Sequence, residues 1–169
     1  MKSRLCALRI GALGFVALAS VSHAGAPKAR SPLLGTWALE VARMPVPAEA
    51  RPKSVTITFA EADQGKWSTK VDIIDNDGSE RHMGSAYTVN GAAVTIEGDQ
   101  LEADTASVAI PAPRTMIMAL AKAAERRPGS TRVYSVSEDR RRMTETAVSW
   151  DDNGIPMMRT SYFVRVARK

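Results

Sequence analysis

The chain has 169 residues, of which 23 are lysine or arginine and 18 are aspartate or glutamate, giving a formal net charge of +5 at pH 7. Residues 1–24 hold three of the basic residues and none of the acidic ones, which leaves 20 basic against 18 acidic residues and a charge of only +2. That balance gives little support to a nucleic-acid partner. The single cysteine, Cys6, lies in the same N-terminal stretch, so the rest of the chain can form no disulfide.

The N-terminal stretch has the pattern of an export signal. Basic residues precede an apolar run over 10–20, and Ser22 and Ala24 are small residues at the two positions that a signal peptidase reads. We therefore expect a signal peptide over 1–24 and a periplasmic or secreted protein. A retained membrane anchor is the alternative, but the run is short and rich in glycine and alanine for a membrane span.

The remaining chain is the size of one domain, expected over residues 33–169 after a flexible leader over 25–32. Its first strand is predicted from the alternation at 33–41, where Leu33, Gly35, Trp37, Leu39 and Val41 share one face. A glycine in a strand permits close approach of another group, and the tryptophan can fill one end of a closed structure.

The chain continues as short alternating segments separated by turns. Residues 44–52 contain several prolines and are expected to form a loop across one mouth of a barrel. Asn90-Gly91 is a strong hairpin signal. The pattern predicts an all-β fold, a single antiparallel up-and-down barrel of roughly eight or nine strands with room for one small ligand. Beyond the first strand, the expected strands lie near 55–59, 67–73, 81–89, 94–96, 101–110, 133–136, 143–150 and 158–166.

One helix is expected within this meander, over residues 114–127. Thr115 is a suitable N-cap, Ile117 and Leu120 begin an apolar stripe with helical spacing, and Pro128 follows the end. Such a helix packs on the barrel as a cap or forms a lid over its open mouth. In the lid interpretation the adaptable side chains of Met116, Met118, Ile117 and Leu120 contact the ligand.

The first and last strands carry a family resemblance. Gly35-Thr-Trp37 resembles the Gly-x-Trp opening of the lipocalins, and the ending Tyr162–Val166 resembles the bacterial lipocalin-like domains of exported proteins, which are calycin-type barrels. The resemblance implies a barrel floor formed by Gly35, Trp37 and a C-terminal arginine over the indole. Strand alternation favours Arg168 for that role over Arg165. The helix between strands and the missing disulfide depart from the family pattern.

The expected function is that of an exported protein that holds a small, mainly apolar molecule in the barrel. The alternative is a structural or protein-interaction barrel filled by its own side chains, and an interior below about 300 Å³ would favour it. No cofactor is expected. The predicted ligand-binding side chains face the interior: Leu39, Val41, Ile57, Phe59, Val71, Ile73, Tyr87, Tyr134 and Tyr162, with Val55 and Val94 beside them.

Catalytic and metal-binding patterns are weak. The acidic segments 75–78 and 151–154 lack the ligand spacing of a calcium loop and read as hairpin turns. Outside the signal, His82 is the only histidine, too few for a transition-metal site or a triad. We expect no enzyme, because a lipocalin-like isomerase or hydrolase would need His82 or a carboxylate inside the barrel.

Two arginine groups could form a basic surface. Arg126 and Arg127 lie near Arg132 in the sequence, and a second run spans 140–142. Acidic neighbours, including Glu145, dilute these charges, and few aromatic residues are present to stack bases. We interpret both groups as solvated turns, with no nucleic-acid partner expected.

Overall fold

The computed structural model describes residues 30–151 and 153–167. The predicted signal peptide, most of the predicted leader and Arg168 lie outside the described residues. The 3-10 turns are η1 Val41–Arg43, η2 Ala48–Ala50, η3 Asp63–Gly65 and η4 Ala123–Glu125. The strands are β1 Gly35–Leu39, β2 Ser54–Glu61, β3 Trp67–Ile74, β4 Glu80–Tyr87, β5 Asn90–Thr95, β6 Glu97–Gly98, β7 Thr105–Ala112, β8 Thr115–Lys122, β9 Arg127–Val136, β10 Arg142–Trp150 and β11 Pro156–Arg165.

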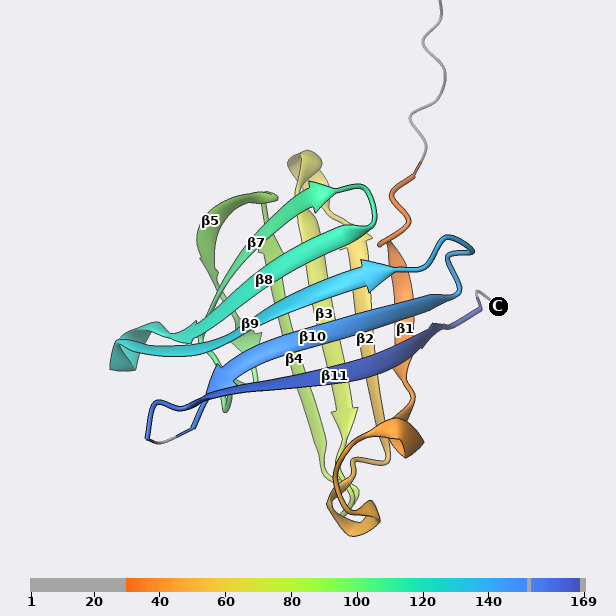
Figure 1. The fold of residues 1–169 in the computed structure, drawn as a ribbon. Coiled ribbons are helices and arrows are strands. Elements are labelled where there is room, and N and C mark those ends of the chain that lie inside the picture. Colours follow the sequence, from red (N-terminus) through yellow and green to blue (C-terminus); the bar gives the residue numbers. More distant parts are fainter. Residues whose placement is uncertain (1–29, 152, 168–169) are drawn as a thin grey trace, which may run out of the picture.

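The strands form one antiparallel sheet that curls into a nearly closed barrel (Figure 1). Its order is β5-β7-β8-β9-β10-β11-β1-β2-β3-β4-β6. The chain from 90 to 98 joins the two sides, because β5 pairs with β7 whereas β6 pairs with β4. Gly98 has a φ of +84°, and a side chain there would overlap the His82 carbonyl oxygen. The all-β barrel is thus confirmed, and it is compatible with a calycin-like barrel.

The predicted helix over 114–127 is wrong. Residues 115–122 form β8, which pairs with β7 and β9, and the only helical residues after it before β9 are the turn η4. Met116 and Met118 are buried while Ile117 is exposed, so the burial has the period of a strand. Residues with good helix propensity adopt the extended form here because strands on both sides offer backbone partners.

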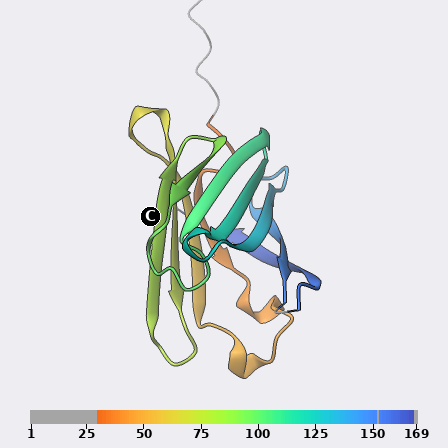
Figure 2. The same cartoon turned by 90° about the vertical axis from the view of Figure 1, so that its left-hand side faces the viewer.

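The barrel has a filled end and an open end. Trp37, Phe59 and Tyr87 are almost completely buried at the filled end, together with Leu33 and Met116. Figure 2 shows β2–β4 on one side and β8–β11 on the other, with residues 41–52 near one end. At that open end β1 leads into η1, and β10 and β11 are joined by their hairpin. None of the helices in the described part of the chain is long and apolar enough to span a membrane.

Candidate functional site: a barrel cavity with charged walls

The open half of the barrel encloses a cavity of about 360 Å³. The segment 41–52 contributes Met44, Val46 and Pro52 to its lining, so the proline-rich loop lies along the mouth. Arg51 fixes the shape of this loop, because its guanidinium donates to the carbonyl oxygens of Val46 at 2.9 Å and Met44 at 3.2 Å. The cavity is therefore bounded by strands and by a braced loop.

Five of the predicted interior residues line this cavity. They come from four strands on opposite sides of the barrel, and alternation places each on the inward face. Tyr134 is fully buried, and its ring meets Phe59 edge-on at a centroid distance of 5.4 Å. The five are Leu39, Ile57, Val71, Ile73 and Tyr134, and Val55 joins them.

Four predicted interior residues do not line the cavity. Phe59 and Tyr87 are buried in the core of the filled end. The Tyr87 hydroxyl lies 2.6 Å from Thr69 Oγ1, and burial raises the Tyr87 pKa to about 12. Val41 belongs to the turn η1. Tyr162 lies on the outward face of β11, where the Arg43 guanidinium lies 3.5 Å from the centre of its ring.

The predicted lid is part of the wall. Met118 and Leu120 line the cavity from β8 and not from a helix over the mouth. Met116 is completely buried near the filled end, and Ile117 points outward. Because these side chains belong to a strand paired on both edges, they form a fixed wall.

The floor combines Trp37 with an arginine. The Trp37 indole donates from Nε1 to the Leu33 carbonyl oxygen at 2.9 Å. The cation over its ring is Arg165, whose Cζ lies 4.0 Å from the ring centre. Trp37 and Arg165 are direct cross-strand partners, so their side chains lie on the same face of the sheet. The expectation from strand alternation, which favoured Arg168 over Arg165, is therefore wrong about Arg165.

Gly35 makes this arrangement possible. Its φ is +132°, and a side chain at this position would overlap Nη1 of Arg165. The guanidinium also donates from Nη1 to the Leu34 carbonyl oxygen at 2.7 Å and from Nε to that of Arg140 at 2.6 Å. Burial and the nearby Arg140 lower the pKa of Arg165 below its usual value.

The cavity wall on β9 and β10 holds a buried ion pair, Arg132 with Glu145, to which the half-exposed Glu102 is added. Arg132 pairs with Glu102 and with Glu145, the latter at 3.3 Å between Nη1 and Oε1. The Tyr134 hydroxyl donates to the same oxygen of Glu145 at 3.4 Å. Burial opposes the charge of Arg132, but its neighbours Tyr134, Glu145 and Glu102 raise its pKa well above the ordinary value. Burial, followed by the charge of Glu145, raises the pKa of Tyr134.

The strand register gathers this network. Tyr134 on β9 lies opposite Glu145 on β10, which lies opposite Ser161 on β11. The sequence interpretation placed Arg132 in a solvated basic group and used Glu145 only as an acidic neighbour that dilutes such charges. The burial of both side chains contradicts the solvated assignment of Arg132 and reveals a role for Glu145 that was not expected. The sequence signal that could have found them is strand alternation, in which residues two positions apart lie on the same face. Arg132 is two residues from the buried Tyr134, and Glu145 is two residues from the buried Met143.

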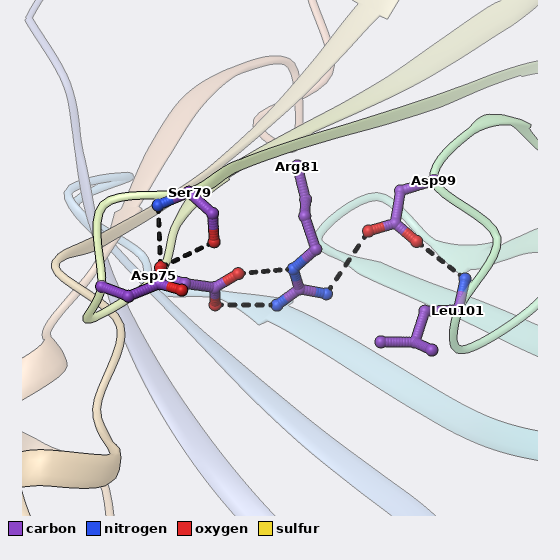
Figure 3. Close-up of polar contacts among 6 residues, drawn as sticks. Asp75, Ser79, Arg81, Asp99 and Leu101 are labelled. Carbon is purple, nitrogen blue, oxygen red and sulfur yellow. Dashed lines mark hydrogen bonds and ion pairs between the residues drawn. The ribbon is translucent and has the colours of Figure 1, made fainter.

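A second arginine, Arg81 on β4, also lines the cavity and holds two carboxylates (Figure 3). Its guanidinium donates to both Asp75 oxygens at 2.7 and 3.0 Å, and Nη1 lies 3.6 Å from Asp99. The hydrogen bond from Arg81 lowers the pKa of Asp75. Asp75 also begins the predicted turn, because its carbonyl oxygen accepts from Gly78 N at 3.0 Å.

His82 lies on the outer surface of the barrel. Its side chain is 56% exposed, with Nδ1 2.6 Å from Asp72 and Nε2 3.3 Å from Glu80. These carboxylates, Asp72 first, raise the His82 pKa above 6.5. His82 is therefore not the inward group that the enzyme alternative needs, but the other half of that condition is met, because the carboxylates of Asp75 and Glu145 line the cavity. Over residues 30–151 and 153–167, no three His, Cys, Asp or Glu side chains are grouped for a metal ion.

Comparisons with protein-family models, curated proteins and solved structures find no match. The site must therefore be interpreted from its own geometry.

Proposed function

We propose that this protein is an exported, lipocalin-like binding protein that holds one small, mainly apolar molecule in the open half of its barrel. The supporting observation is the 360 Å³ cavity, which exceeds the roughly 300 Å³ lower limit of typical small-molecule sites. The proposed export rests on the signal pattern of residues 1–24. The lipocalin relationship rests on Gly35, Trp37 and the arginine over the indole.

The driving force in this proposal is removal of apolar ligand surface from water. Leu39, Ile57 and Val71 supply apolar wall on one side, and Met118 and Leu120 supply it on the other. The few charged side chains in the wall orient the polar end of the molecule, as in most small-molecule pockets. No step of this function requires a reaction.

Filling the cavity tests the proposal. Ser85 lines it from β4, whereas the next residue, Ala86, is exposed on the outside. Ser85→Phe should abolish binding of prodan, a neutral fluorescent probe of apolar sites, because the new ring occupies the cavity. Ala86→Phe is the matched control and should bind like the wild type. Prodan emission gives the affinity, and circular dichroism verifies that each variant is folded.

The same experiment distinguishes a ligand-binding barrel from the alternative of a structural barrel. If wild-type protein fails to shift prodan emission, or if Ser85→Phe binds as well as Ala86→Phe, the cavity is not a ligand site. Native mass spectrometry of protein purified from its own source would then be expected to show the bare chain only. A co-purified small molecule would instead identify the natural ligand.

A further inference from the structure

Glu145 presents an unused acceptor to the cavity. Its side chain is 6% exposed, and both its contact with Arg132 and its hydrogen bond from Tyr134 go to Oε1. Within residues 30–151 and 153–167, no hydrogen bond reaches Oε2. In the same part of the chain every completely buried side-chain oxygen or nitrogen has a partner. Oε2 therefore keeps access to open space, and Glu145 lines the cavity.

The charges around this atom favour a positive partner. Arg132 is shared between two carboxylates: Glu145, whose side chain is 6% exposed, and Glu102, whose side chain is 50% exposed. The buried Glu145 therefore has only a part of one cation. The Arg81 network repeats the pattern with Asp75 and Asp99. The third arginine of the lining, Arg159, is exposed near the start of β11, and its charge acts on Glu102.

We infer that the cavity takes an amphipathic amine, whose ammonium group donates to Glu145 Oε2 while its hydrocarbon part lies among the apolar wall residues. This inference rests on the proposed function and names its ligand class. A buried carboxylate with a free oxygen gains most from a charged donor, since charge-assisted hydrogen bonds are about twice as strong as neutral ones. An alcohol satisfies the same atom without neutralising it. A carboxylate end would place a second negative charge beside Glu145 with no cation of its own.

The inference is tested with three ligands that share a linear eight-carbon skeleton and differ in their terminal polar group: octylamine, octan-1-ol and octanoate. At pH 7 the amine is protonated, as a lysine side chain is. Titration calorimetry with the wild-type protein should give the order amine, alcohol, carboxylate, with octylamine at least tenfold tighter than octanoate. Glu145→Gln should weaken octylamine by about tenfold relative to octan-1-ol. Glu97→Gln, at an exposed glutamate on β6, is the matched control and should change nothing.

Two results would overturn the inference alone: prodan binds but octanoate matches octylamine, or prodan binds and Glu145→Gln binds octylamine like the wild type. The wild-type ligand order needs no variant, so a misfolded Glu145→Gln protein cannot hide the answer. If neither prodan nor any of the three ligands binds the wild-type protein, the proposed function and this inference both fail.

Discussion

Replacing Arg165 by methionine should destabilise the barrel at its floor. The guanidinium lies 4.0 Å from the centre of the Trp37 ring and donates to the carbonyl oxygens of Pro32, Leu34 and Arg140. Methionine keeps an apolar stem over the indole and removes every one of these polar contacts. The change therefore isolates the contribution of the charged group.

The magnitude follows from the contacts. The cation over the indole contributes about 1 kcal/mol, and each hydrogen bond from the guanidinium to a carbonyl oxygen contributes about 1 kcal/mol net. These terms share one side chain and do not add independently, so we expect a loss of about 3 kcal/mol of unfolding free energy. For a domain of this size that loss lowers the melting temperature by about 10 °C.

Urea unfolding followed by tryptophan fluorescence, together with a thermal melt, measures the effect. Arg165→Lys keeps the charge but not the planar fork, so about half the loss should remain. A Gly35→Ala change should also be destabilising, because its side chain would overlap Nη1 of Arg165, and it should cost less when Arg165 is already methionine. An unfolding midpoint equal to the wild type in Arg165→Met, or full stability in Arg165→Lys, would refute this account of the floor.

The remaining predictions concern ionisation. Because the folded-state pKa of His82 is raised above 6.5, its contribution to stability is fully present below pH 6.5 and is lost as the pH rises through the folded pKa. Urea midpoints measured across that pH range should show this decline in the wild type and not in His82→Gln. The same pH profile in both proteins would contradict a stabilising role of protonated His82. Arg132→Met should cost about 3–5 kcal/mol by leaving Glu145 buried without its cation, and adding Glu145→Leu should restore most of the loss. Equal urea midpoints for the single and double variants would show that the loss does not come from the uncompensated charge of Glu145.

The barrel was predictable where alternation was regular and turns were explicit. Leu39 and Trp37 were assigned to the correct face because their strand alternates without interruption. Residues 115–122 were not predictable in this way, because methionine, leucine and alanine favour helices and their apolar positions fit both periods. Pairing with β7 and β9 decides between helix and strand for this segment, and a single sequence does not show which strands will be its neighbours.

The charged part of the site was the least predictable. An inward Arg132 or Glu145 contradicts the expectation that charged residues are exposed. Only the register reveals that they lie diagonally across neighbouring strands, with Tyr134 opposite Glu145 and Arg132 opposite Ala147. Strand alternation was also insufficient at the C-terminal end of the chain. It divides the residues of β11 between two faces but does not say which face is inward, whereas the pairing of Trp37 with Arg165 does.

The junction between β4 and β6 has a consequence for the size of the molecule that the proposed function would admit. Two paired positions, Met83 with Gly98 and Gly84 with Glu97, and one adjoining backbone hydrogen bond, from Asp99 N to the His82 carbonyl oxygen at 2.8 Å, join the sheet edges there. Met83 and Gly84 also line the cavity. A ligand larger than the cavity would be accommodated at the lowest free-energy cost by separating β4 from β6, because so few backbone hydrogen bonds oppose that separation. If the proposed function holds, the upper limit on ligand size is set by this short ladder in the side wall as well as by the width of the mouth.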